Sequence, residues 1–568
     1  MDLKGKPFYL NDKDIQWVES TLAGMTLEEK IGQLFCLVAY TNDQELLRKY
    51  AADYKAGGLM CRPMTAVQNM DAVKILQENA RIPMLIAANL ERGGASVVDE
   101  GTCIGSQLQV AATDDDDMAY KLGVVCGREG AAVGINWAFA PIIDIDYNFR
   151  NPITNSRTFG SDAERVKRMG AAYVKGLQEY GLAASIKHFP GDGVDERDQH
   201  LVTSVNSLSC EDWDQTYGAA YKESIDAGAM TVMVGHIMQP AYTKKMNPEI
   251  MEEDILPASL SHELTTKLLK EQLGFNGLVV TDATTMAGML IPMPRSKAVP
   301  LAIAAGCDMF LFSRNLDEDY GYMKKGIEEG VITQERLQEA LTKILALKAA
   351  LKLHRKKEEG TLVPSPAEAM KVLGSNEHKA WAVECADKSV TLVKKEENVL
   401  PLSPEKYKKV LFYDIESSEG YAYSVRSGVA RMFREKLEQE GFDIDGFDPN
   451  KGMEGRMTPF SAIAEKYDLI LYLANLKTKS NQTIVRIEWS QPMGANVPVY
   501  MTSVPTIFIS VENPYHLLDV PRVRTFINTY YSNDEVLDAL VDKLLGRSEF
   551  KGTNPVDPFC GRWDAKLS

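Results

Sequence analysis

Short apolar runs recur along the first part of the chain, and amphipathic stretches separate them. A buried parallel strand carries a continuous apolar run, whereas a surface helix has apolar residues at every third or fourth position. The predicted strands cover residues 57–61, 84–88, 135–141, 183–188, 231–236, 277–281 and 309–312. The predicted helices cover residues 65–80, 163–180, 210–227 and 262–273, and residues 1–36 are predicted to be helical after a short arm.

This alternation of strands and helices indicates an α/β fold with a parallel sheet. The number of predicted strands favours a TIM-like (β/α)8 barrel over residues 1–355. An open, doubly wound sheet is the alternative, because periodicity alone does not separate the two architectures.

The remaining chain predicts a second α/β domain. Residues 356–380 mix charged side chains with Pro and Gly and are expected to form a linker. Strand patterns follow at residues 410–413, 469–473 and 506–511, and helical patterns lie at residues 424–439 and 533–545. We therefore expect a C-terminal α/β three-layer sandwich over residues 381–568.

Polar residues follow the predicted strands of the first domain, at the point where each strand ends. They are Asn89, Glu91, Asp144, Asp146, Lys187, His188, His236 and Asp282. The carboxyl ends of barrel strands meet at one rim, where the active sites of such folds are built. This series of polar strand ends therefore predicts an active site.

Composition narrows the range of partners. The 568 residues carry 79 Asp and Glu against 63 Lys and Arg, a formal net charge of −16. This acidic balance argues against a nucleic-acid partner, whose phosphates need a positive field. The N-terminus has no apolar core of signal-peptide length, and no later run approaches the length of a membrane span, so we expect no membrane partner and a cytoplasmic location. A mature form with its leader removed is the alternative. The eight cysteines and seven histidines show no metal-ligand spacing, and we predict neither a metal nor a cofactor.

Residues 186–200, IKHFPGDGVDERDQH, carry much of the candidate chemistry. An apolar strand ends in Lys187 and His188, a Phe-Pro-Gly break follows, and the loop closes with Asp198-Gln199-His200. Asp198 can accept the imidazole N–H of His200, which fixes the tautomer and supports the protonated ring. Such a histidine can move a proton near neutral pH. A solvated turn with an incidental histidine is the alternative.

Asp282 is a second candidate, because it ends the apolar strand GLVVTD. A carboxylate at a strand end is held rigidly and faces the rim, which suits a nucleophile. The alternative role is a cap on the helix that follows.

The sequence KHFPG, followed by a loop that ends in Asp-x-His, resembles the β-N-acetylglucosaminidase branch of glycoside hydrolase family 3. The resemblance implies a retaining glycosidase that acts on a small carbohydrate substrate, such as chitobiose or cell-wall fragments, and removes terminal β-linked N-acetylglucosamine. It implies Asp282 as the nucleophile and the Asp198-His200 pair as the general acid/base. It also implies sugar-binding roles for Lys187, His188, Arg157, Glu91, Asn89 and Met286. Arg157 lies in NPITNSRTFGSD, which is similar to the family's NPxxxxRSFGxD.

The loop departs from the family pattern PGHGDTxxDSH. Asp192 stands where the family has His, and Gln199 stands where it has Ser. Near Gly93-Gly94, Asn89 replaces the family's Asp, while Glu91 aligns with its Glu. These changes bear on the sugar that is bound more than on the class of reaction.

Three other functions stay open. A β-glucosidase of the same family would draw a glutamate acid from the second domain. A glycoside phosphorylase is a further alternative, because a histidine acid/base repels attacking phosphate less than a carboxylate would. A third alternative, of a different class, is an inactive sugar-binding or regulatory protein.

Overall fold

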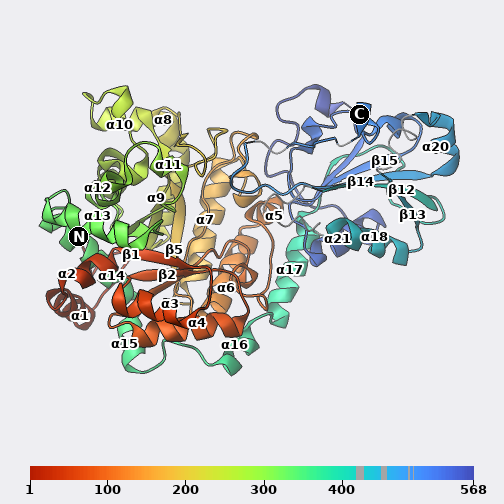
Figure 1. Cartoon of the computed structure of the whole chain (residues 1–568). Helices are drawn as coiled ribbons and strands as arrows, with labels where there is room; N and C mark the ends of the chain where they lie inside the picture. Colours follow the sequence, from red (N-terminus) through yellow and green to blue (C-terminus); the bar gives the residue numbers. More distant parts are fainter. Residues whose placement is uncertain (417–427, 449–456, 484–485, 490, 568) are drawn as a thin grey trace. The chain divides into compact units, whose positions relative to one another are not determined.

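The computed structural model describes residues 1–416, 428–448, 457–483, 486–489 and 491–567 (Figure 1). Contacts between residues group the chain into two units. The first consists of Met1–Cys103, Asp116–Thr154 and Asp162–Lys379, and the second of Ile104–Asp115, Asn155–Ser161 and Ala380–Ser568. The predicted boundaries at residues 355 and 381 stay a prediction of where separately folding domains end and begin.

The first unit contains an eight-stranded parallel sheet in the order β10-β1-β2-β3-β4-β5-β7-β9. A parallel bridge between Val280 and Met309 connects β9 to β10, so the strands are nearly closed into a barrel. This confirms the predicted (β/α)8 barrel. The strands are β1 (Phe35–Ala39), β2 (Gly58–Cys61), β3 (Leu85–Ala88), β4 (Trp137–Ala138), β5 (Ala183–Phe189), β7 (Thr231–Val234), β9 (Leu278–Thr281) and β10 (Phe310–Leu311).

The predicted helical stretch over residues 1–36 is too long. Residues 1–36 are not helical to their end, because β1 begins at Phe35. The two helices before it are α1 (Asp12–Ala23) and α2 (Leu27–Gln33). A capping box starts α2, in which the Thr26 hydroxyl accepts the N–H of Glu29 and the Glu29 carboxylate accepts the N–H of Thr26.

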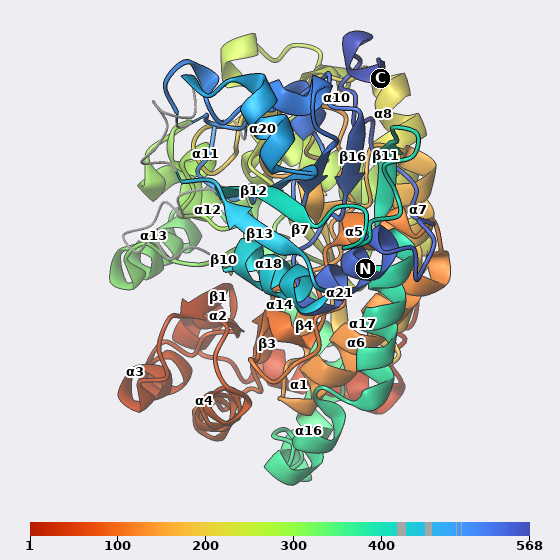
Figure 2. The same cartoon turned by 90° about the vertical axis from the view of Figure 1, so that its right-hand side faces the viewer.

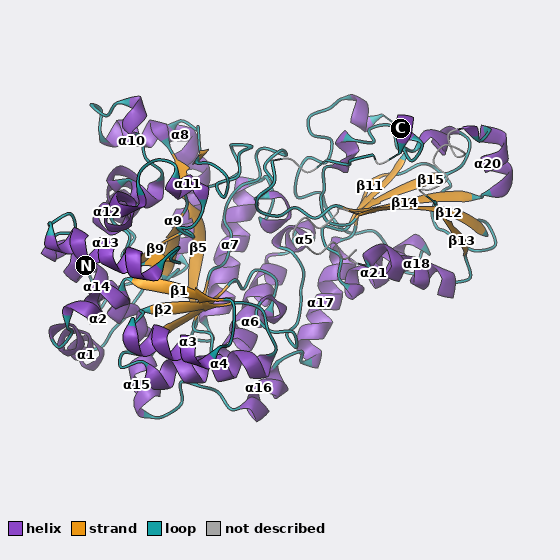
Figure 3. Cartoon of the chain, in the orientation of Figure 1, coloured by secondary structure: helices purple, strands orange, loops and turns teal. Residues whose placement is uncertain are grey.

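Helices surround the barrel strands (Figure 3). They are α3 (Gln44–Arg48), α4 (Ala66–Asn79), α6 (Asp116–Ala132), α7 (Ala163–Gln178), α8 (Cys210–Trp213), α9 (Ala219–Asp226), α10 (Pro240–Met246), the π-helix η7 (Glu263–Gln272), α11 (Ala287–Leu290), α12 (Arg295–Ala305), α13 (Leu316–Glu328), α14 (Gln334–Ala350), α15 (Leu353–Glu358) and α16 (Pro366–Val372). None of the helices in the described part of the chain has the length and apolar character needed to cross a membrane.

The second unit is built on a six-stranded sheet in the order β11-β16-β15-β14-β12-β13, in which only β11 is antiparallel to its neighbour. Its strands are β11 (Thr391–Lys394), β12 (Lys409–Glu416), β13 (Asp443–Gly446), β14 (Leu469–Asn475), β15 (Thr506–Ser510) and β16 (Thr525–Asn528). The helices of this part are α5 (Gln107–Ala112), α17 (Asn376–Ser389), which begins in the first unit, α18 (Val429–Gln439), α20 (Phe460–Lys466) and α21 (Asp534–Leu544). The helix predicted over residues 424–439 corresponds to α18, and its residues 424–427 lie outside the described ranges.

Both faces of this sheet are buried. Along β12, Val410 and Phe412 pack into a core with α18 and α21, while Leu411 and Tyr413 pack into a second core on the other face. Figure 2 shows α18 and α21 on the same side of β12 and β13. Successive residues of a strand point to opposite faces, so a strand buried on both sides must be apolar throughout. The predicted three-layer sandwich is thereby confirmed.

Candidate active site

Asp282 is the first residue after β9, at the carboxyl-terminal rim of the barrel. Its N–H donates to the carbonyl of Val234 at 2.8 Å, and its Oδ1 accepts the N–H of Ala283 at 2.7 Å. Asp282 does not cap α11, whose N-cap residue is Met286. Only 13% of the Asp282 side chain is exposed.

The charges around Asp282 keep it ionised. Burial alone would raise its pKa, but the imidazoles of His188, His236 and His200 hold the pKa of Asp282 below its usual value. An ionised carboxylate with little solvent around it is the state that a nucleophile requires.

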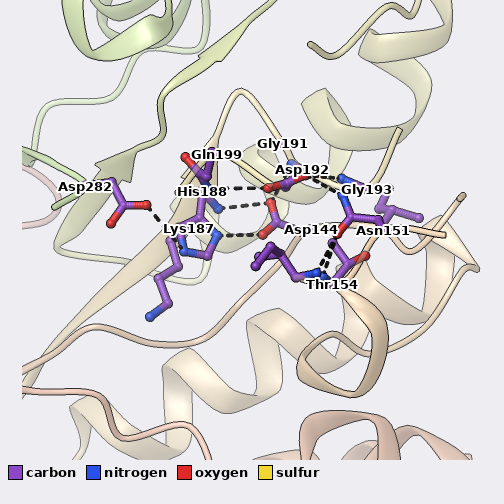
Figure 4. Close-up of polar contacts among 12 residues, drawn as sticks. Asp144, Asn151, Thr154, Lys187, His188, Gly191, Asp192, Gly193, Gln199 and Asp282 are labelled. Atoms are coloured by element: carbon purple, nitrogen blue, oxygen red, sulfur yellow. Dashed lines mark hydrogen bonds and ion pairs between the residues drawn. The ribbon is translucent and has the colours of Figure 1, made fainter. Parts of the chain in front are cut away.

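His188 connects Asp282 to a second carboxylate. Its Nδ1 lies 2.7 Å from Asp144 Oδ2, and its Nε2 lies 3.9 Å from Asp282 Oδ2 (Figure 4). Asp144 also accepts the N–H of His188 at 3.0 Å. Because a carboxylate accepts, Nδ1 carries the hydrogen in this contact, and Nε2 is the nitrogen that faces the nucleophile. The sequence marked Asp144 only as a polar strand end and missed its role as the partner of His188.

Lys187 occupies a buried position beside two residues that follow β3. Its Nζ donates to Glu91 Oε1 at 2.8 Å and to Asn89 Oδ1 at 3.4 Å. Only 3% of the Lys187 side chain is exposed. The structure therefore brings together three of the predicted sugar-binding residues as one hydrogen-bonded group.

The predicted contact between Asp198 and His200 is present. Asp198 Oδ1 lies 2.7 Å from His200 Nδ1 and also accepts the N–H of His200 at 2.8 Å. The Asp198 side chain is fully buried, whereas 28% of the His200 side chain is exposed. A buried carboxylate oriented in this way supports a protonated imidazole whose other nitrogen can face a substrate.

Backbone contacts attach the Asp198–His200 turn to the loop that carries Asp282. Ala287 N donates to the carbonyl of His200, and Gly288 N to the carbonyl of Gln199, both at 3.1 Å. Farther along, β6 (Ser204–Val205) pairs with β8 (Ile237–Met238), which follows β7. The loops after three barrel strands are thus joined at the rim.

Two glycines give the loop after β5 its path. Gly191 has φ 115° and Gly193 has φ 108°, a region that other residues rarely adopt. A Cβ atom on Gly191 would lie 2.1 Å from the ring of Tyr217, and one on Gly193 would lie 1.9 Å from the carbonyl oxygen of Ile145. The Pro-Gly-Asp-Gly sequence therefore places Asp192 between two positions where only glycine fits.

The other two predicted site residues are Met286 and Arg157. Met286 is buried in the loop after Asp282, where its N–H donates to the carbonyl of Ala283 at 3.1 Å. Arg157 lies in the segment Asn155–Ser161, which belongs to the second unit, so its role at the sugar stays a prediction. His236 is a further buried neighbour, held by the Ser259 hydroxyl at 2.8 Å and the Ala283 carbonyl at 3.0 Å. No group of three metal-ligating side chains occurs within the described ranges.

The chain is similar in sequence to several known proteins. The family model of the glycosyl hydrolase family 3 N-terminal domain matches residues 26–347. A β-N-acetylglucosaminidase/β-glucosidase from Cellulomonas fimi is 54% identical over 568 residues, the whole length of both chains. β-Hexosaminidase A from Pseudoalteromonas piscicida is 29% identical over 343 residues, 57% of this chain and 56% of that protein.

Solved structures of known enzymes resemble the chain along nearly its whole length. A β-glucoside phosphorylase, BglX, is 44% identical, has a TM-score of 0.92 and covers 99% of both chains. A family 3 β-N-acetylglucosaminidase from Paenibacillus sp. str. FPU-7 is 24% identical and supports the fold alone, with a TM-score of 0.77 over 94% of this chain and 99% of that one. The family match, the full-length relative and the shared two-domain fold lead to one conclusion. The chain belongs to glycoside hydrolase family 3 and is an enzyme that cleaves glycosidic bonds.

Proposed function

We propose that this enzyme removes terminal, non-reducing β-linked N-acetylglucosamine and glucose from small glycosides, with retention of configuration. The observation that carries the proposal is the pairing of an ionised strand-end carboxylate, Asp282, with a carboxylate-supported imidazole, His200, in loops joined by hydrogen bonds. The relative from Cellulomonas fimi, which is named for both activities, supports including both sugars.

In the first step, Asp282 attacks the anomeric carbon and a covalent glycosyl ester forms as the bond to the leaving oxygen breaks. His200, as imidazolium, gives its proton to that oxygen, and the charge of Asp198 stabilises the protonated ring. In the second step, neutral His200 takes a proton from water, the water oxygen attacks the anomeric carbon, and Asp282 departs as a carboxylate. Lys187 would donate a hydrogen bond to a sugar hydroxyl, and His188 would hydrogen-bond another through Nε2.

Phosphate is a second candidate acceptor for the glycosyl group. The likeness to a β-glucoside phosphorylase along nearly the whole chain favours this alternative. A neutral imidazole adds no negative charge beside the anomeric carbon, whereas a carboxylate base would repel a phosphate dianion. Phosphate would attack through its own ionised oxygen, so His200 would not need to remove a proton in that step.

The test uses nitrophenyl β-N-acetylglucosaminide and nitrophenyl β-glucoside, each with and without inorganic phosphate. Free sugar as the product supports hydrolysis, and sugar 1-phosphate of retained configuration supports phosphorolysis. A 2-deoxy-2-fluoroglucosyl or 5-fluoro-N-acetylglucosaminyl donor should label the peptide that contains Asp282. A label on another residue, or a product of inverted configuration, would contradict the proposal.

A further inference from the structure

Asp192 and Gln199, two residues at which the loop departs from the family pattern, are in contact with each other. Gln199 Nε2 donates to Asp192 Oδ2 at 3.3 Å (Figure 4). Both residues are almost completely buried. Buried polar groups need partners, so the two side chains depend on each other.

The orientation of the Gln199 amide is determined by a backbone donor. Gln199 Oε1 accepts the N–H of His236 at 2.8 Å, which leaves Nε2 to face Asp192. The other oxygen of Asp192, Oδ1, accepts Asn151 Nδ2 at 2.9 Å and the N–H of Gly193 at 2.7 Å. A backbone N–H cannot become an acceptor, so neither side chain can reverse its polarity without losing a hydrogen bond.

Gln199 is the middle residue of the Asp198–His200 turn. Its side chain joins the turn to the end of β7 through His236 and to the Gly191–Gly193 loop through Asp192, while its carbonyl accepts Gly288 N. We propose that Asp192 and Gln199 are positioning residues, which hold the Asp198-His200 pair where His200 protonates the leaving group. The inference rests on the acid/base role proposed for His200.

The charge state of Asp192 agrees with this role. Burial, together with the negative charges of Asp144 and Asp198, raises the pKa of Asp192 to about 8. A neutral Asp192 still has lone pairs for all three donors around it. It adds no further negative charge beside Asp144 and Asp198, so the carboxylate of Asp198 can act on the imidazole alone.

The contact can be broken with almost no change of shape. In Asp192→Asn, the amide oxygen must face Gly193 N and Asn151, so its NH₂ group opposes Nε2 of Gln199. We expect kcat/KM to fall about tenfold with a disaccharide substrate and less than about threefold with a nitrophenyl glycoside, whose leaving group departs without protonation. A contact that served packing alone would not distinguish the two leaving groups.

A second substitution should restore the contact with reversed polarity. In Asp192→Asn/Gln199→Glu, one oxygen of the introduced carboxylate accepts the N–H of His236 and the other accepts the introduced amide. The double variant also keeps the number of carboxyl groups unchanged. We expect its kcat/KM on the disaccharide to recover to within about threefold of the wild type. The matched control is Gln199→Glu alone, which replaces the amide donor to Asp192 with a further acidic group and should lose activity on the disaccharide.

Three outcomes separate the possible explanations. Equal losses on both leaving groups, or a folded double variant without recovery, would overturn the positioning role. Thermal unfolding shows whether Asp192→Asn folds. If it does not, Gln199→Ser replaces it, because this variant removes the contact without a clash. Its loss of kcat/KM on the disaccharide, compared with its loss on the nitrophenyl glycoside, then tests the positioning role in the same way. His200→Ala tests the underlying function independently, because only a wrong acid/base assignment would leave that variant without leaving-group selectivity.

Discussion

His188 Nε2 lies 3.9 Å from Asp282 Oδ2, although the two residues belong to strand ends that β7 separates in the sheet. This distance is too long for a hydrogen bond, so the carboxylate oxygen keeps its lone pairs for attack. Asp144 holds the opposite side of the ring. The arrangement keeps Asp282 ionised and available, which the first prediction tests.

Asp282→Asn should reduce turnover at least about a thousandfold on every substrate, because the amide cannot form the covalent intermediate. The fluorinated donor should then label no peptide, while circular dichroism and thermal unfolding remain close to those of the wild type. Asp282→Ala offers a second measurement, since added azide can occupy the space and yield a glycosyl azide of inverted configuration. Retention of activity in both variants would exclude Asp282 as the nucleophile.

His200→Ala should lose far less activity with a nitrophenyl leaving group than with a natural disaccharide, by a ratio of about a hundredfold or more. The measurement is kcat/KM over a series of aryl glycosides of rising leaving-group pKa, where the variant should show the steeper dependence. Equal losses across the series would mean that the proton comes from another group.

Asp198→Asn should give an intermediate loss, because it keeps the imidazole but removes the charge that supports its protonated form. The basic limb of the pH–rate profile should move to lower pH, since the imidazolium is lost more readily. Asp195→Asn is a suitable control, because Asp195 pairs with Arg197 in the same loop and has no contact with His200 among those described. An unchanged basic limb in Asp198→Asn would contradict the prediction.

The pKa of Asp192 predicts how stability depends on pH. Since the folded-state pKa is raised to about 8, the folded protein keeps a proton that the unfolded chain has lost between about pH 4 and pH 8. The free energy of unfolding should therefore fall as pH rises through this window, by up to about 1.4 kcal/mol per pH unit. Denaturant unfolding at a pH of about 5, 6.5 and 8 measures this free energy. Its dependence on pH should be shallower for Asp192→Asn. Parallel pH profiles for the two proteins would refute it.

Gly193→Ala should destabilise the protein by about 3 kcal/mol or more, because the new Cβ would clash with the carbonyl oxygen of Ile145 and because alanine is strained at the positive φ of this position. Gly274→Ala is the matched control, since Gly274 has φ 70° and nothing within 4 Å of its Cβ position. That control should cost only the backbone term, about 1 kcal/mol. Chemical denaturation measures both, and similar losses would show that the steric contact with Ile145 is relieved.

Most of the fold could be predicted because burial on both faces leaves continuous apolar runs. The same property explains the error at β1, where Phe35–Ala39 follows a helix without a polar break and its apolar residues carry no period that separates strand from helix. The run over residues 135–141 yields only Trp137–Ala138 as β4. Pro141, which has no N–H to donate, lies at the end of that run.

The candidate site could be predicted where its contacts are local. Asp198 and His200 are two residues apart, so their hydrogen bond can be inferred from spacing alone. The contact between Asp144 and His188 spans 44 residues and depends on how β4 and β5 align. The sequence marked Gln199 only as a departure from the family pattern, because an amide between two reactive residues has many possible roles until its partners are known.

The two units are formed by six alternating segments of the chain, and this affects how the protein can fold during synthesis. Ser106 donates to the carbonyl of Tyr530, and Thr553 N donates to the carbonyl of Ala112, so the short segment Ile104–Asp115 finds its partners more than four hundred residues later. The segment Asn155–Ser161 likewise depends on a much later residue, because Ser161 N donates to the carbonyl of Pro555. A nascent chain cannot complete the second unit until its last residues emerge, and no single cut in the polypeptide releases either unit whole.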